Sequence, residues 1–253
     1  MPPERGMSIC AARKACAAVS GRLPEAMSRS APLLVFDLDG TLVDTAPDLI
    51  SALNVILRRE QLPPIPLASA RNLIGAGARK LIERGFEAEG RPLTPEDTAR
   101  LTRDFIDHYA AHIADESRPF EGLTEALDHL AMEGCRFAVC TNKLEWLSRK
   151  LLDALDLTTR FDAICGADTF GVSKPDPAIL RQTIARAGGD LTTAIMVGDA
   201  GTDVGAARRA GIPVIGVSFG YTETPIRDLN PDLVIDHMRE LAGAVAALNG
   251  KTI

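Results

Sequence analysis

The sequence predicts an α/β fold: a Rossmann-like parallel sheet into which an all-helical domain is inserted. After residue 30, short apolar runs alternate with amphipathic helices, which is the pattern of βαβ units. The runs mostly lack polar alternation, as expected for strands that helices cover on both faces. About 100 residues without a convincing strand separate the first two runs, far more than a crossover needs. At 253 residues, the chain has room for roughly 1.7 domains of typical size.

Six strands are predicted along the chain. They cover residues 33–36, 136–140, 161–165, 194–197, 213–217 and 233–235. Proline and glycine mark the helices between them, because proline suits the first turn of a helix and glycine suits its end. Pro177 is predicted to begin a helix that Gly188 ends, and Gly211 to end another over residues 204–210.

Residues 46–115 are predicted to form the inserted helical domain, and residues 31–45 and 116–253 the α/β core. Its first helix begins at Thr45-Ala-Pro-Asp48, a capping-box pattern, followed by an apolar stripe. Another helix begins at Thr94 and places Leu101, Phe105 and Tyr109 on one face.

Residues 1–30 differ in composition and are left out of the predicted fold. They are rich in alanine, serine and basic residues and lack the sustained apolar segment of a secretory signal. We expect a disordered N-terminal extension, with a transit peptide as the alternative.

Composition narrows the range of partners. The net charge of −6 disfavours a nucleic-acid partner. No apolar stretch approaches the roughly 18 residues of a membrane helix, so no membrane partner is expected. The five cysteines form no pair with zinc or redox spacing, which favours a reducing cytoplasm.

Four polar clusters follow predicted strands, at the edge where open α/β sheets bind ligands. In chain order they are Asp37-Leu-Asp39-Gly40-Thr41, Thr141-Asn142-Lys143, Lys174-Pro175 and Gly198-Asp199-Ala-Gly201-Thr202-Asp203.

The clusters suit phosphoryl chemistry. A carboxylate can attack phosphorus and form an aspartyl-phosphate, and Asp37, directly after its strand, is the candidate nucleophile. Asp39 is placed to protonate the leaving alkoxide and then to deprotonate water. Bringing the carboxylates of Asp37 and Asp39 together with those of Asp199 and Asp203 is electrostatically unfavourable. Each like-charge pair costs about 4 kcal/mol at ~4 Å and an effective dielectric of ~20. A cation is therefore required, and Mg²⁺ suits oxygen ligands and a phosphate.

Together the clusters resemble the four motifs of the haloacid dehalogenase superfamily, over essentially all of residues 31–240. The resemblance implies that residues 46–115 form a helical cap on the α/β core. It also implies metal ligation by the Asp37 side chain, the Asp39 backbone carbonyl and Asp199, with Asp203 acting from behind them.

The phosphate oxygens are expected to meet Thr141, Asn142 and Lys174. Thr141 offers a hydroxyl, Asn142 a backbone N–H, and Lys174 a positive charge that also restrains Asp37. Lys143 is interpreted as a surface residue.

Within the superfamily, the stretches 71–84 and 218–221 resemble those of phosphoglycolate phosphatases. That substrate has a carboxylate besides its phosphate, so its cap should present cations or free N–H groups near a helix start. The predicted cap contacts are Gly75, Gly77, Arg71 and Arg79, with Lys80 nearby. A tight turn with solvated bases is the alternative.

The expected function is Mg²⁺-dependent hydrolysis of a small phosphorylated metabolite, 2-phosphoglycolate, by a monomer or homodimer. A phosphatase for sugar phosphates, pyrophosphate or nucleotides, or a β-phosphoglucomutase-type mutase, is the alternative. Residues 47–60 lack the histidine typical of mutase caps, and Asp39 disfavours a dehalogenase. A receiver domain would carry its acidic pair first and its lysine last, and a non-catalytic binding protein would lack a motif residue.

Overall fold

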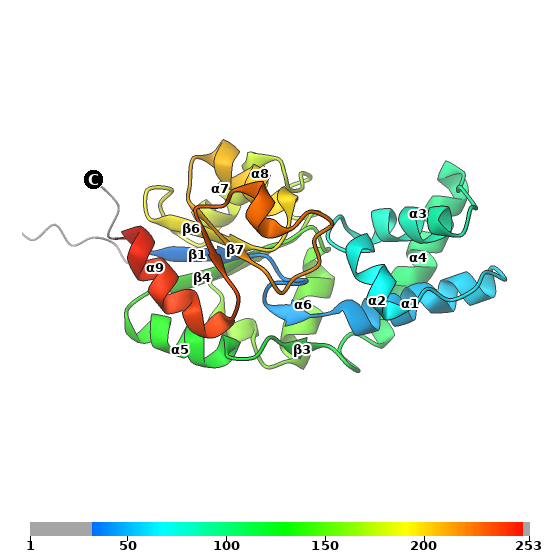
Figure 1. The fold of residues 1–253 in the computed structure, drawn as a ribbon, viewed down its shortest axis with the longest axis horizontal. Coiled ribbons are helices and arrows are strands. Elements are labelled where there is room, and N and C mark those ends of the chain that lie inside the picture. The colour runs from blue at the N-terminus through cyan, green and yellow to red at the C-terminus, as the bar shows by residue number, and fades with distance from the viewer. Residues whose placement is uncertain (1–31, 250–253) are drawn as a thin grey trace, which may run out of the picture. The chain divides into compact units, whose positions relative to one another are not determined.

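The computed structural model describes residues 32–249, so the extension expected at residues 1–30 lies outside the described residues. Its central sheet has six parallel strands in the order β5-β4-β1-β6-β7-β8 (Figure 1). They are β1 (Leu33–Phe36), β4 (Arg136–Cys140), β5 (Ala163–Cys165), β6 (Ala194–Gly198), β7 (Val214–Val217) and β8 (Leu233–Ile235). In the centre, Leu33 of β1 pairs with Arg136 of β4 and with Ala194 of β6. The carboxyl ends of these three strands therefore lie side by side.

The predicted α/β class and all six strands are confirmed, with shifts at some ends. β5 begins at Ala163 rather than Phe161. β7 begins at Val214, because Pro213 has no N–H for a ladder bond. The helix end predicted at Gly211 is also confirmed: this residue has a φ of 79° and caps the preceding helix.

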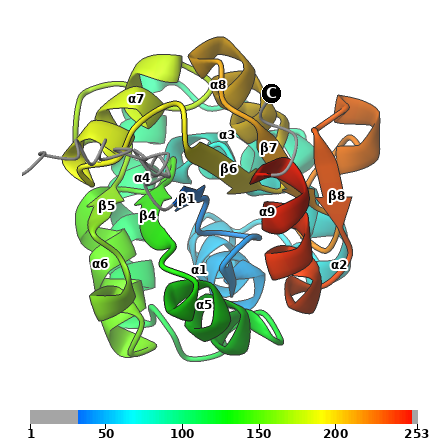
Figure 2. The ribbon, with the colours of Figure 1, turned by 90° about the vertical axis from the view of Figure 1, so that its left-hand side faces the viewer.

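Helices cover both faces of the sheet (Figure 2). On one face lie α5 (Leu123–Met132), α6 (Glu145–Ala154) and α9 (Leu241–Asn249), and on the other α7 (Pro177–Arg186) and α8 (Gly201–Ala210). Short 3₁₀ turns cover Arg71–Leu73, Thr158–Arg160, Ile226–Leu229 and Met238–Glu240. Along β1, Leu34 and Phe36 pack into the first of the two apolar clusters, and Leu33 and Val35 into the second. Burial on both faces explains the unbroken apolar runs of the strands.

The helices that follow β1 pack on one another beyond the carboxyl ends of the strands (Figure 1). They are α1 (Ala46–Arg59), α2 (Leu67–Ala70), α3 (Ala78–Ala88) and α4 (Pro95–Ala111). Leu101, Phe105 and Tyr109, predicted to share a face of α4, are buried. The chain enters and leaves these helices through an antiparallel pair, β2 (Val43–Asp44) with β3 (Arg118–Pro119). That helices α1 to α4 form a separate cap domain stays a prediction.

The capping box predicted at the start of α1 is wrong. Thr45 precedes the helix but makes no capping hydrogen bond, and its hydroxyl donates instead to Asp39 at 2.7 Å. The buried Asp48 carboxylate accepts hydrogen bonds from the backbone amides of residues 116 and 117 and from the Ser117 hydroxyl. Asp48 therefore ties the first turn of α1 to the segment by which the chain returns to the sheet.

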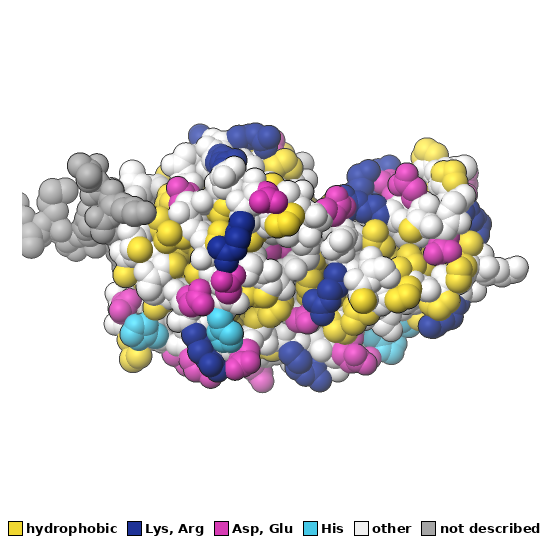
Figure 3. Space-filling model, in the orientation of Figure 1, with side chains coloured by type: hydrophobic (Ala, Val, Ile, Leu, Met, Phe, Trp, Pro, Cys, Tyr) yellow, Lys and Arg dark blue, Asp and Glu magenta, His cyan; other side chains and the backbone are white. Residues whose placement is uncertain are grey.

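On the face shown in Figure 3, acidic, basic and hydrophobic side chains are interspersed. No helix among residues 32–249 is both long and apolar enough to cross a membrane. Cys135, Cys140 and Cys165, the cysteines within this range, are free and buried. Burial raises the pKa of Cys140 to about 12, so this thiol is an inert part of the core.

Candidate active site

Asp37 leaves β1 at the edge of a cavity. Its side chain lines this space of about 270 Å³ and is otherwise buried. Its Oδ1 accepts hydrogen bonds from the Leu38 amide at 2.7 Å and pairs with the Lys174 ammonium at 2.8 Å. Its Oδ2 accepts no hydrogen bond from the described residues. The arrangement fixes the carboxylate through one oxygen and leaves the other for a reacting group.

Lys174 lies between two carboxylates, with no exposed side-chain surface. Its Nζ is 2.8 Å from Asp37 and 2.6 Å from Asp203. Burial disfavours the charged ammonium, but Asp203 and Asp37 outweigh this and raise the pKa of Lys174 above its ordinary value. A charged lysine therefore sits directly beside the candidate nucleophile.

The helix predicted over residues 204–210 begins three residues earlier than expected. Helix α8 begins at Gly201, so Asp203 lies in its first turn. One of its oxygens accepts the Ala200 amide at 3.0 Å and the other accepts from Lys174. Asp203 thus closes the loop after β6 while holding Lys174.

Asp199 is fixed by two segments that are distant in sequence. Its carboxylate accepts hydrogen bonds from the Thr41 hydroxyl at 3.0 Å and the Tyr221 amide at 2.7 Å. Gly40 has a φ of +83°, and a Cβ there would lie 2.6 Å from Asp199 Oδ2. Only glycine permits this backbone conformation at so close an approach.

The carboxylates of Asp37, Asp199 and Asp203 suit a metal ion. One oxygen of each lies within 4.8 Å of those of the other two. Burial, partly offset by Lys174, raises the pKa of Asp37 to about 6, while burial and the charges of Asp37 and Asp203 raise that of Asp199 to about 8. A divalent cation would relieve this repulsion, and hard oxygen donors are the ligands it prefers.

The loop after β4 brings Thr141 and Asn142 to the same place. Thr141 is buried and lines the cavity. The Asn142 amide group accepts a hydrogen bond from the Lys174 backbone N–H at 2.9 Å and donates to the carbonyls of Lys174 at 3.2 Å and Gly75 at 3.4 Å. Asn142 therefore joins the loop after β4 to the loop that carries Lys174 and to the backbone of Gly75.

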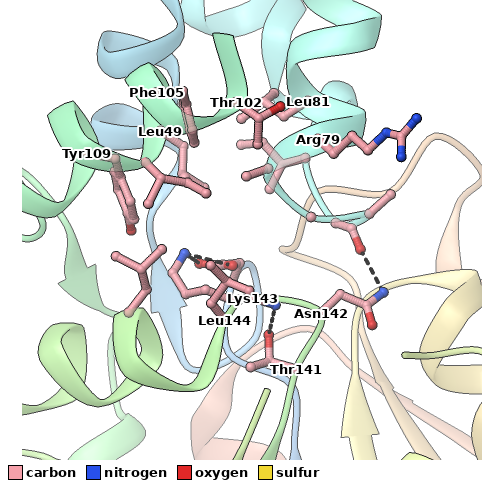
Figure 4. Close-up of a pocket in the computed structure, with 18 of the residues that line it drawn as sticks. Leu49, Arg79, Leu81, Thr102, Phe105, Tyr109, Thr141, Asn142, Lys143 and Leu144 are labelled. Carbon is pink, nitrogen blue, oxygen red and sulfur yellow. Dashed lines mark hydrogen bonds and ion pairs between the residues drawn. The ribbon is translucent and has the colours of Figure 1, made fainter. Parts of the chain in front are cut away.

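Lys143 does not lie on the surface, which corrects its interpretation from the sequence. Its side chain is 5% exposed, and its Nζ is 2.8 and 3.0 Å from the two carboxylate oxygens of Asp39 (Figure 4). The ammonium also lies 4.7 Å from the centre of the Tyr109 ring. Burial opposes the charge, but Asp39 raises the pKa of Lys143 above its ordinary value. Nothing in the residues around Lys143 signals this, because the contact needs β4 beside β1.

Gly75 and Gly77 line the cavity from the cap side. Gly77 precedes α3 with a φ of 86°, and a Cβ there would lie 3.2 Å from the Asn142 carbonyl oxygen. Gly75 has a positive φ too but open space where a Cβ would be. The close approach of the loop before α3 to the loop after β4 therefore occurs at Gly77.

The basic residues predicted to contact the substrate from the cap form ion pairs with acidic side chains instead. Arg79 lines the cavity, but its guanidinium points away from it (Figure 4) and pairs with Glu83 at 2.9 Å. Lys80 pairs with the same Glu83 at 2.7 Å. Arg71 is not among the cavity-lining residues and pairs with Asp44 at 3.1 Å.

Tyr221 completes a small network around Asp44 that the sequence did not reveal. The Tyr221 hydroxyl donates to Asp44 and accepts the Ala46 amide at 3.1 Å. The Arg71 guanidinium lies 5.2 Å from the centre of the Tyr221 ring. The network connects the start of α1 to the loop after β7. In the sequence, the only indication of it was the resemblance noted for residues 218–221.

The parallel sheet, with four polar clusters at the carboxyl ends of its strands, is the arrangement of one large family of hydrolases. Residues 34–217 match the haloacid dehalogenase-like hydrolases, and the chain belongs to this family. Over 215 residues it is 50% identical to a phosphoglycolate phosphatase of Caulobacter vibrioides, which covers 85% of this chain and 91% of the relative. A phosphoglycolate phosphatase of Mesorhizobium japonicum is 46% identical, with 86% and 96% covered. The predicted family and enzyme class, a phosphatase, are thus confirmed.

Solved structures agree with this assignment. A predicted phosphoglycolate phosphatase from Haemophilus somnus superimposes with a TM-score of 0.78 at 27% identity, covering 86% of this chain and 99% of the other. CbbY from Rhodobacter sphaeroides, solved in complex with phosphate, shares the fold with a TM-score of 0.71 at 23% identity, covering 83% of this chain and 96% of the other.

Proposed function

We propose that this protein is a Mg²⁺-dependent phosphomonoester hydrolase that converts 2-phosphoglycolate to glycolate and phosphate. The observation that carries the proposal is Asp37, which has one free oxygen at the cavity and lies beside Lys174. The two relatives at 50% and 46% identity support the substrate, since both are phosphoglycolate phosphatases.

Asp37 acts as the nucleophile. Its Oδ2 attacks phosphorus, the bond from phosphorus to the glycolate oxygen breaks, and Asp39 gives that oxygen a proton. Asp39 then takes a proton from a water molecule, which attacks the phosphorus of the aspartyl-phosphate. Phosphate leaves, and the Asp37 carboxylate is restored.

The remaining motif residues position the phosphoryl group. The Thr141 hydroxyl, the Asn142 backbone N–H and the Lys174 ammonium donate to its oxygens, where negative charge spreads in the transition state. Asp37, Asp199 and the Asp39 backbone carbonyl would hold Mg²⁺, with Asp203 behind them. When bound, Mg²⁺ supplies positive charge to a phosphoryl oxygen.

Residues 46–115 act as a cap that closes over the substrate and excludes water. The cavity supports this proposal, because its lining joins Leu49 and Phe105 of these helices to Asp37 and Thr141 of the core. Cys135, Cys140 and Cys165, the cysteines among the described residues, are free and buried, which supports a cytoplasmic location.

Phosphate release by the purified full-length protein tests the proposal. With Mg²⁺, kcat/KM for 2-phosphoglycolate is expected to exceed that for β-glucose 1-phosphate, pyrophosphate and other sugar phosphates. EDTA or Asp37→Asn should abolish turnover, whereas Asp107→Asn, at an exposed site on α4, should not.

Turnover that survives EDTA or Asp37→Asn would refute the mechanism. A better substrate elsewhere in the panel would refute the named substrate only. Formation of glucose 6-phosphate from β-glucose 1-phosphate would identify a mutase.

A further inference from the structure

The cavity contains a cation that the mechanism above leaves unused. Lys143 lines it together with Asp39, the proposed general acid. An ammonium has three N–H donors, and two of those of Lys143 reach the Asp39 oxygens. The third donor lies on the side of Tyr109, with no carboxylate besides Asp39 paired to the ammonium among the described residues.

The wall opposite Lys143 is apolar apart from its hydroxyls. It includes Leu49, Leu81, Phe105 and Ile106 from the cap helices. A carboxylate enclosed against such a wall loses its hydration, and this is costly unless a charged partner replaces the water. A second anionic group on the substrate therefore needs a cation inside the cavity.

Tyr109 provides a second, independent sign of a ligand. It is 1% exposed, lines the cavity, and its hydroxyl makes no hydrogen bond of normal geometry among the described residues, although it lies within the influence of the Lys143 ammonium. Figure 4 shows this hydroxyl on the side of the cavity where Lys143 lies. An ammonium can only donate, so the hydroxyl proton has no acceptor there. A buried O–H without an acceptor is uncommon, because desolvating it costs free energy, and an oxyanion held by Lys143 would accept its hydrogen bond.

The other cations near the cavity are less suitable. Lys174 is absent from its lining and lies between Asp37 and Asp203. Arg79 points away from the cavity (Figure 4) with a side chain that is 70% exposed. Among the described residues, Lys143 is the buried cation that faces the space beside Asp39.

The distances fit a short acid. In the proposed mechanism Asp39 protonates the leaving oxygen, and the Lys143 ammonium lies 2.8 Å from Asp39 Oδ1, so a group next to the leaving oxygen would come within reach of the ammonium. The carboxyl carbon of phosphoglycolate is two bonds from that oxygen. Longer leaving groups would place an anion deeper among the cap side chains.

We infer that the Lys143 ammonium and the Tyr109 hydroxyl form the subsite for the carboxylate of the leaving group, so that a loop of the core selects the substrate. This rests on the proposed function and deepens it. The same lysine then bridges two carboxylates, that of Asp39 and that of the substrate.

Two substrates of equal size separate this role from any other role of Lys143. 2-Phosphoglycolate is compared with 2-hydroxyethyl phosphate, in which a CH₂OH group replaces the carboxylate. For Lys143→Met, kcat/KM for 2-phosphoglycolate is expected to fall by about 100-fold, mainly through KM, because the contact exists in both the ground and transition states. For 2-hydroxyethyl phosphate, where only the contact of Lys143 with Asp39 is lost, kcat/KM should fall at least about 10-fold less than for 2-phosphoglycolate.

Further variants show whether a loss of activity in Lys143→Met comes from the subsite or from misfolding. Lys143→Arg should recover part of the preference for the acid, and Tyr109→Phe should lower it by about 5-fold. Lys150→Met, which removes an exposed lysine from α6, is the matched control and should retain the wild-type preference.

The outcomes distinguish failure of the subsite from failure of the proposed substrate. An equal loss on both substrates in Lys143→Met, with unchanged preference in Tyr109→Phe, would overturn the subsite while the wild-type preference upholds the proposed function. A wild-type enzyme without preference for 2-phosphoglycolate would overturn the proposed substrate and the subsite with it.

Discussion

At the scale of single residues, the site depends on charges that are buried together. Lys174 is enclosed with Asp37 and Asp203, each within 2.8 Å of its Nζ. Removing one member of such a group leaves a charge without compensation, which costs more than an exposed ion pair ever contributes. The same residue therefore serves stability and the proposed reaction.

Replacing this lysine tests both roles. Lys174→Met is expected to lower the free energy of unfolding by about 3–5 kcal/mol, which corresponds to a fall in Tm of about 10 °C, and to lower kcat by about 10³-fold. Thermal unfolding in EDTA and steady-state phosphate release measure the two effects. Lys150→Met, at an exposed position, is the control, and a Lys174→Met protein with wild-type Tm would contradict the buried-charge account.

At the scale of elements, α1 to α4 are joined to the core by a few specific contacts. The two connecting segments pair as β2 and β3, and Asp48 binds the amides of residues 116 and 117. Asn142 reaches the carbonyl of Gly75. Such contacts set the position of the helices over the cavity.

The contact of Asp48 can be removed without touching the cavity. Asp48→Ala is expected to cost about 3 kcal/mol, because the buried amide and hydroxyl of Ser117 and the partly buried amide of Glu116 lose a charged acceptor. Urea unfolding should show this loss. Asp107→Ala, on the exposed surface of α4, should change the free energy of unfolding by less than about 0.5 kcal/mol, and equal values for the two variants would rule out the tie.

Gly75 and Gly77, in the loop before α3, form a matched pair for substitution. Gly75→Ala and Gly77→Ala both place a side chain at positive φ, which costs about 1–2 kcal/mol. Only Gly77→Ala also pushes against the Asn142 carbonyl, 3.2 Å from the added Cβ. We expect Gly77→Ala to lower Tm further and to reduce kcat/KM more than Gly75→Ala. The reverse order in both assays would show that the close approach at Gly77 is unimportant.

At the scale of the whole molecule, the site is assembled from loops that follow different strands. β4, β1 and β6 are neighbours, so their loops bring Asp37, Thr141 and Asp199 together. The net charge of −6 does not describe this edge, where buried acids alternate with Lys143 and Lys174. The two lysines, together with a cation bound by the acidic side chains, would offset the local negative charge. An anionic substrate could then approach this edge of the sheet.

The metal-free protein should lose stability as pH rises. The pKa of Asp199 is about 8 in the folded state against 3.8 in a free side chain. The folded state therefore binds an extra proton between about pH 4 and 8, and the free energy of unfolding falls with pH across that window. In EDTA, Tm at pH 8 should lie a few degrees below Tm at pH 6, and Mg²⁺ should restore it.

Asp199→Asn is the control for this titration. Its Tm in EDTA should fall less between pH 6 and 8 than that of the wild type, because the titrating carboxyl is gone. An equal fall in both proteins would assign the pH dependence to other groups.

The sequence by itself determined the class of fold and predicted the candidate residues of the reaction. Strands covered on both faces require unbroken apolar runs, and ligand-binding residues follow the carboxyl ends of parallel strands, so both signals are local in the chain. Asp37, Thr141, Lys174 and Asp199 were predicted in this way, and they lie within residues 34–217, which match the family.

Only the tertiary structure decided which partners these residues meet. The contact of Lys143 with Asp39 spans 104 positions, that of Asp48 with Ser117 69, and that of Tyr221 with Asp44 177. Each depends on strand order and on the path of the chain around the inserted helices, which local patterns do not encode. For that reason, the sequence predicted the reaction from neighbouring residues, whereas the carboxylate subsite at Lys143 emerged only from the folded chain.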